Sequence, residues 1–330
     1  MKNITPIRMS KELTTRTEIT EQNETLMVDV IEDFVSLKNS VHTSRSYRSD
    51  IKSFFNGLEV IFLTDFAVIP FPTVVDEVRI YFDHHTKKDK QTHKVLNPKT
   101  VNRKTYSLSA FFNYLIDVYG YPKNPIKQFS PLKTDRKSTT ISLTRAEIID
   151  LLEFAKGRHR ESKAKFRDYL ILVFMFALAL RREEVVNLKW DDVNFQKQTI
   201  NVYQKGGSYK LLPLPISIVV LLDNFKKNNS ADCPYIFHPV RNNRTKELNK
   251  PIRSNYIFEM VKKIASEIVP DKKITPHSFR KTFIELALNN KEDFISIINA
   301  TGHSTVEMIK YYDTRDALKH NAIHSIARIV

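Results

Sequence analysis

The feature that most constrains the fold is an apolar run in the middle of the chain, from Tyr169 to Leu180, which Arg181 and Arg182 follow at once. A helix that crosses a membrane needs about 20 apolar residues, so this run is too short to span one. A helix that is apolar on every face must be covered by protein on every face. We therefore expect a soluble protein in which this segment is a buried core helix.

The chain before this run contains apolar residues at helical spacing. Helices are predicted within residues 24–38, 43–55, 76–84 and 100–118. Residues 1–24 are polar and are expected to be flexible. Residues 131–142 are polar with few apolar members, which is typical of a linker. These patterns predict a small helical domain over residues 25–130.

The rest of the chain, residues 143–330, has mixed patterns. Thr144 with Glu147 three positions later predicts a capped helix start. A strand over 199–203, a turn at Gly206–Gly207 and a returning segment at 211–214 predict a hairpin. Further helical segments are expected at 144–156, 165–180, 216–226, 253–267, 278–289, 291–299, 304–311 and 317–330. The predicted fold class is mainly α with a small antiparallel β-sheet.

The charge of the chain indicates its class of partner. The formal net charge is +15, which favours nucleic acid because lysine and arginine displace counterions from phosphates. The alternatives are a mere excess of lysine and a membrane surface, but no basic amphipathic helix stands out. Cys233 is the one cysteine, so no intrachain disulfide can form, and the polar N-terminus lacks the apolar core of a signal peptide. These features predict a cytoplasmic protein without a zinc site.

Six polar residues follow one another in a fixed order along the second region: Arg181, Lys205, His277, Arg280, His303 and Tyr312. Together with the sequence from Ala179 to Val193, this order and its spacings resemble the tyrosine recombinase (phage integrase) family. Three positions depart from the family pattern: Ala179 stands where glycine is usual, Lys281 where histidine is common, and Thr301 where leucine is common.

The resemblance implies a site-specific DNA recombinase with chemistry like that of type IB topoisomerases. Tyr312 would attack a DNA phosphate and form a 3′-phosphotyrosine, with Tyr311 as its core neighbour. Arg181 and Arg280 would bind the non-bridging oxygens. Lys205 would protonate the leaving 5′ oxygen, with Lys210 as a competing candidate.

The remaining residues of the motif would support this chemistry. His277 would transfer a proton or bind the phosphate, and His303 would bind the same phosphate. Glu184 would orient an arginine or histidine, or else be a solvated carboxylate. The resemblance implies no metal ion and no cofactor.

The resemblance also implies a helical core-binding (SAM-like) domain and a mixed α/β catalytic domain that clamp double-stranded DNA between them. The candidate DNA contacts are Arg103, Lys104, Lys133, Arg136, Lys137, Arg182 and Lys281. Assembly is expected as a dimer on one site and a tetramer in the synaptic complex, with residues 317–330 docked on a neighbouring subunit. The main alternative is a sequence-specific DNA-binding regulator without strand exchange. A non-specific coat protein for RNA or chromatin would leave the spacings unexplained.

Overall fold

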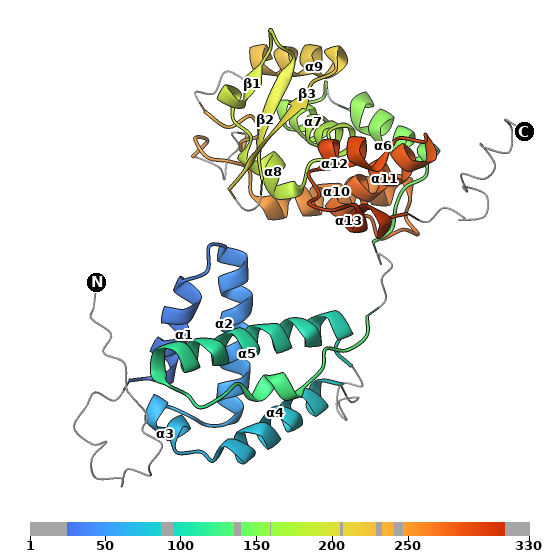
Figure 1. Cartoon of the computed structure of the whole chain (residues 1–330). Helices are drawn as coiled ribbons and strands as arrows, with labels where there is room; N and C mark the ends of the chain where they lie inside the picture. The colour runs from blue at the N-terminus through green and yellow to red at the C-terminus, as the bar shows by residue number, and fades with distance from the viewer. Residues whose placement is uncertain are drawn as a thin grey trace, which may run out of the picture. The chain divides into compact units, whose positions relative to one another are not determined.

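A computed structural model describes residues 25–86, 95–134, 140–158, 160–204, 207–228, 233–240 and 247–313. The chain divides after Asp135 into two compact units, each of which is described by itself (Figure 1). This division falls within residues 131–142, where a linker was predicted. Among the described residues, no helix is both long and apolar enough to cross a membrane.

The first unit is entirely helical in its described part. Its elements are α1 (Met27–Ser36), α2 (Val41–Gly57), α3 (Leu63–Ala67), α4 (Phe71–Thr86), α5 (Pro98–Tyr119) and the 3₁₀ turn η1 (Pro125–Gln128). The longest helix, α5, begins where Asn97 accepts a bond from the backbone N–H of Lys99 at 2.9 Å and ends at Gly120 with φ 70°. A left-handed residue after a helix favours glycine, which explains why the helix stops there.

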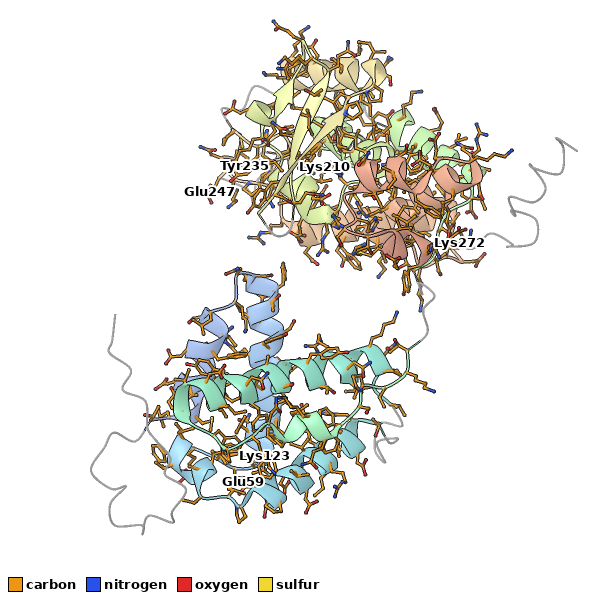
Figure 2. The ribbon with its side chains drawn as sticks, viewed as in Figure 1. Glu59, Lys123, Lys210, Tyr235, Glu247 and Lys272 are labelled. Atoms are coloured by element: carbon orange, nitrogen blue, oxygen red, sulfur yellow. The ribbon has the colours of Figure 1, made fainter. Side chains whose placement is uncertain are left out.

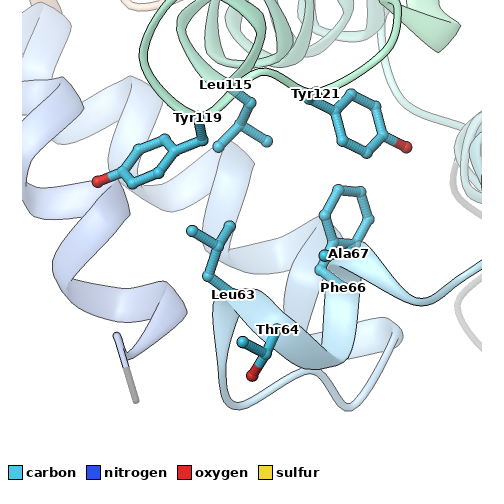
Figure 3. A pocket seen from close by; sticks show the side chains of 7 residues that line it. All are labelled: Leu63, Thr64, Phe66, Ala67, Leu115, Tyr119 and Tyr121. Atoms are coloured by element: carbon cyan, nitrogen blue, oxygen red, sulfur yellow. The ribbon is translucent and has the colours of Figure 1, made fainter. Parts of the chain in front are cut away.

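The core of the first unit is built from aromatic rings. Phe55 of α2 packs edge-on against Phe111 of α5, with ring centroids 5.5 Å apart. Phe66 stacks on Tyr121 at 5.2 Å. Figure 3 shows α3 facing the end of α5 across a small apolar cavity of about 40 Å³. The sequence did not predict α3, because five residues are too few for a helical period to emerge.

The second unit is mainly helical and carries one small sheet. Its elements are α6 (Arg145–Gly157), α7 (Lys163–Ala177), α8 (Arg182–Asn187), η2 (Trp190–Asp192), β1 (Val193–Asn194), β2 (Thr199–Tyr203), β3 (Tyr209–Pro213), α9 (Ile216–Asn228), α10 (Ser254–Ile268), α11 (Pro276–Asn289), α12 (Phe294–Thr301) and α13 (Val306–Lys310). The sheet is antiparallel in the order β1-β2-β3, and Val202 pairs with Lys210. The predicted fold class is confirmed.

The apolar run does form the central helix of this unit. From Leu170 to Leu172 and again at Phe174 and Met175, no side chain of α7 is exposed. The helix ends at Ala177, three residues earlier than predicted, and the chain then turns sharply at Ala179, which has φ 49°. Residues 178–180, directly after α7, are buried as well, so the chain that leads to Arg181 is packed in the core.

Local sequence signals set several other boundaries. Thr144 and Glu147 form the predicted capping box, with bonds of 3.2 and 2.7 Å. The strand β2 has the predicted bounds, whereas the two-residue strand β1 was not predicted. Gly206 and the predicted helix over 317–330 lie outside the described residues.

Candidate active site

The first part of the site is the corner between α7 and α8, which holds Arg181. Glu184 accepts bonds from both the backbone N–H and the guanidinium of Arg181, at 2.8 and 2.7 Å. The Glu184 side chain is 3% exposed, whereas that of Arg181 is 29% exposed. Glu184 therefore orients Arg181 toward solvent, and the alternative in which Glu184 is a solvated carboxylate is wrong.

Arg280 of α11 is the most buried cation of the site, with 2% of its surface exposed. Its Nη1 donates to the carbonyl oxygen of Ala179 at 2.6 Å, and its Nη2 donates to that of Thr301 at 2.5 Å. These two bonds use two of its five N–H groups, and Nη2 also lies 3.3 Å from Nε2 and 3.4 Å from Nδ1 of His303. Burial, followed by the charge of Arg181, lowers the pKa of Arg280 to about 10, so the guanidinium stays charged at neutral pH.

His303 follows α12 and is also buried. The Thr301 hydroxyl donates to the carbonyl oxygen of Ile297 at 2.6 Å, so its oxygen is left to accept from Nδ1 of His303 at 2.8 Å. This pattern places the imidazole proton on Nδ1 and leaves a lone pair on Nε2, which faces Nη2 of Arg280 at 3.3 Å. Burial, followed by the charge of Arg280, lowers the pKa of His303 to about 3, so the ring is neutral at pH 7.

His277 lies in the first turn of α11, three residues before Arg280. The helix begins at Pro276, and Ser278 accepts a bond from the backbone N–H of Thr275 at 3.1 Å. The imidazole still reaches solvent. Desolvation by neighbouring atoms, followed by the charges of Arg280 and Arg181, lowers its pKa. His277 therefore stands at the open side of the arginine pair.

Tyr312 follows α13 and lies beside His303. The centroids of the two rings are 5.8 Å apart. Tyr312 also packs partly against a small core formed by Ile284, Leu288, Ile297 and Ile309. Tyr311 packs edge-on against Tyr312, with ring centroids 5.4 Å apart.

Lys205 and Lys210 are the two candidates for the proton donor, and the structure describes Lys210. Lys205 lies outside the described residues. Lys210 extends from β3, where Figure 2 labels it, and its Nζ donates to the carbonyl oxygen of Ala300 at 2.8 Å. Burial lowers the pKa of Lys210 to about 8; the charge of Glu184 opposes this shift, and those of Arg280 and Arg181 add to it.

The charges of this cluster do not balance. Arg181, Arg280 and Lys210 carry three positive charges, and Glu184 carries one negative charge, which leaves an excess of two. Uncompensated charge is unfavourable where water is partly excluded. The cluster is therefore suited to an anion with several acceptor oxygens and unsuited to a metal cation.

The predicted DNA contacts fall into different environments. Lys281 is turned inward, where its Nζ donates to Thr140 at 2.8 Å and lies 3.4 Å from Glu285, which argues against a direct DNA contact. Lys104 is also largely covered and donates to Tyr81 at 3.0 Å, with 12% of its side chain exposed.

Other candidates keep their charged groups accessible. Arg103 pairs with the buried Asp50 and is 43% exposed. Arg182 is 33% exposed beside Glu183, and Lys133 is exposed. Arg136 and Lys137 lie outside the described residues.

The chain is similar in sequence and in fold to several known proteins. The sequence profile described as the phage integrase family matches residues 142–318. A tyrosine recombinase of Agathobacter rectalis is 26% identical over 284 residues, which cover 82% of this chain and 85% of that protein. The Tn1549 transposon integrase, solved with transposon right end DNA, is similar in fold with a TM-score of 0.64 and 18% identity over 92% of this chain and 99% of that one. A lambda integrase dimer bound to a core site gives a TM-score of 0.62 at 17% identity, over 92% of this chain and 81% of that one.

Proposed function

The chain belongs to the phage integrase family, and from this premise we propose that it is a site-specific DNA recombinase that cuts and rejoins DNA through a 3′-phosphotyrosine. The proposal is supported by the bonds that hold Arg280 to Ala179, two residues before Arg181, and to Thr301, next to the Ala300 that holds Lys210. The rings of His303 and Tyr312 lie beside each other after the same turn. An excess of two positive charges needs an anion, and a DNA phosphate is one that the basic chain attracts.

The attack would use Tyr312 and the two arginines. The Tyr312 oxygen bonds to phosphorus, the bond from phosphorus to the 5′ oxygen breaks, and the phenolic proton must leave. Arg181 and the remaining N–H groups of Arg280 would bind the non-bridging oxygens as charge develops there. The phenolic proton would pass to His277 or to solvent, because Nε2 of His303 already faces Nη2 of Arg280 at 3.3 Å and its ring, with a pKa of about 3, is a poor base.

The leaving 5′ oxygen needs a proton of its own. We keep Lys205 as the proposed donor, since it matches the family pattern by its position in the hairpin. His277, at the open side of the arginine pair, would bind the phosphate or pass a proton. Rejoining reverses these steps with a new 5′ hydroxyl, and the bond energy is kept in the phosphotyrosine, so no cofactor is required.

The substrate and assembly follow from the same proposal. The partner would be double-stranded DNA, contacted by exposed cations such as Arg103, Lys133 and Arg182. The Tn1549 transposon integrase was solved with transposon right end DNA, and the lambda integrase was solved as a dimer bound to a core site. We propose a dimer on each site and a tetramer in the synaptic complex, with residues 317–330 as the exchanged segment.

The experiment that tests this function traps the covalent intermediate. DNA fragments bound by the protein are selected from sheared source DNA, and the best site is rebuilt with a nick that lets the cut end diffuse away. The wild type should leave DNA on the protein after denaturation, and Tyr312→Phe should not. Tight and specific binding by the wild type without an adduct would instead support the DNA-binding regulator.

A further inference from the structure

Lys210 is joined to an element that lies far away in the sequence. It belongs to β3, and its ammonium bonds to Ala300 in the last turn of α12, 90 residues later. The carbonyl groups at the end of a helix carry partial negative charge, which favours a cation there. The bond therefore fixes both the hairpin and the position of the ammonium group.

The other strand of the hairpin contacts the same turn. Gln204, directly after β2, lies so close to Gly302 that a Cβ on that glycine would be 2.0 Å from Nε2 of Gln204. This Nε2 is buried and has no hydrogen-bond partner among the described residues. The backbone N–H of Gln204 donates to Ser208 at 2.8 Å, which closes the base of the hairpin. Both sides of the hairpin therefore contact the same turn of the chain, residues 300–302, which we call the braced turn.

The braced turn holds two buried groups of the site, Arg280 and His303. Thr301, between Ala300 and Gly302, accepts from Arg280 through its carbonyl oxygen and from His303 through its hydroxyl. A shift of this turn would move the guanidinium and the imidazole together. Lys210 thus stands where it can affect both their positions and the charge around them.

Resting on the proposed function, we propose that Lys210 is a further residue of the phosphate site, where it acts as a fixed cation on the scissile phosphate and not as the proton donor. Its bond to Ala300 uses one of the three N–H groups of the ammonium, so two remain for a phosphate oxygen. Its partner Ala300 directly precedes Thr301, whose carbonyl oxygen accepts from Arg280, so both cations are held on the same turn of the chain.

The assigned role and proton donation predict different rates for a variant on a substrate that has a better leaving group. A substrate with sulfur in place of the 5′ bridging oxygen releases a thiolate, which leaves without a proton. A variant that lacks a proton donor recovers on this substrate. A variant that lacks a fixed cation does not recover, because the non-bridging oxygens still carry charge in the transition state.

The test compares rates of adduct formation at saturating DNA, with oxygen and sulfur substrates, for the full chain. Lys210→Gln should lower the rate by roughly 100-fold on both substrates, as expected for the loss of one oriented charge contact. Lys210→Arg, which keeps the charge, should retain most of the rate. Lys210→Met is the second variant if the amide prevents folding, and it should show the same loss.

Matched variants separate this role from general effects of charge. Lys227→Gln on α9 removes the same charge from a side chain that is 73% exposed and pairs with Asp223, so it should react at the wild-type rate. Lys205→Gln should be slow on oxygen and recover on sulfur.

The possible outcomes are distinct. A wild-type rate in Lys210→Met, or recovery of Lys210→Gln on the sulfur substrate, would overturn the assigned role. If the wild type itself forms no adduct on either substrate, the proposed function fails, and this inference fails with it.

Discussion

Replacing Thr301 by valine tests the hydrogen bonds that fix the His303 ring. Valine has nearly the shape of threonine but lacks the hydroxyl, so the packing at this fully buried position is kept. Two bonds are lost: the one to Ile297 at 2.6 Å and the one from His303 at 2.8 Å. The Nδ1–H of His303 is then left in a buried place without its acceptor.

The expected cost follows from these two bonds. A typical internal hydrogen bond contributes about 1 kcal/mol, and a buried donor left without a partner costs about 1–3 kcal/mol. The ring can escape part of this cost by moving its proton to Nε2. We therefore expect Thr301→Val to lower the free energy of unfolding by about 2 kcal/mol. Thr301→Ser keeps the hydroxyl and loses one buried methyl group, so it should cost about 1 kcal/mol.

Two measurements check this expectation. Trp190 is the single tryptophan of the chain and lies in the second unit, so its fluorescence in urea reports on the unit that holds the site. Nitrogen NMR of the His303 imidazole distinguishes a proton on Nδ1 from one on Nε2. The wild type and Thr301→Ser should carry it on Nδ1, and Thr301→Val should populate the Nε2 form. An unchanged Nδ1 form in Thr301→Val would refute the reasoning, and so would a cost no greater than that of serine.

Two further predictions concern the same turn. Gly302→Ala should lower the free energy of unfolding by roughly 2 kcal/mol or more, because φ is +67° and the new Cβ meets Gln204. Gly157→Ala is the control: a Cβ there has no atom within 4 Å, so the free energy of unfolding should not fall in the same urea titration. Adding Gln204→Ala should restore part of the loss, and no restoration would contradict the contact. The stability of the second unit should also fall as pH drops from about 6.5 toward 3: the pKa of His303 is about 3 in the folded chain, so the unfolded chain binds more protons in that range. The stability of His303→Asn should fall less steeply than that of the wild type between pH 7 and 5. An equal slope for the two proteins would argue against a buried neutral ring.

The sequence predicted those parts of the fold that depend on local patterns. The long helices, the strand β2 and the capping box at Thr144 each follow from residues within one or two turns of one another. The elements α3 and β1 are too short to show a period, so they depend on packing that a local pattern does not contain. For the same reason the inward direction of Lys281 toward Thr140, 141 positions away, could not be predicted.

The order of the motif residues identified the candidate site, but it did not explain how the site is held. Arg280 is fixed by the carbonyl groups of Ala179, in the turn after α7, and of Thr301, at the end of α12, which are 101 and 21 residues away in sequence. Carbonyl groups carry no sequence signal, because every residue has one. The position of Ala179 did carry a signal: glycine is usual there, and glycine is favoured at positive φ. The structure gives Ala179 φ 49°, which aims its carbonyl oxygen at Arg280.

The three departures from the family pattern therefore all affect how the groups of the site are held. Ala179 keeps the left-handed turn with a side chain that is disfavoured there, Thr301 adds a hydroxyl that sets the proton on His303, and Lys281 ties α11 to Thr140 and Glu285. None of them removes a charged or nucleophilic group of the site. They change how the groups are held, so a divergent sequence at these positions is compatible with the same chemistry. The variants of Thr301, Gly302 and Lys210 test how these groups are held.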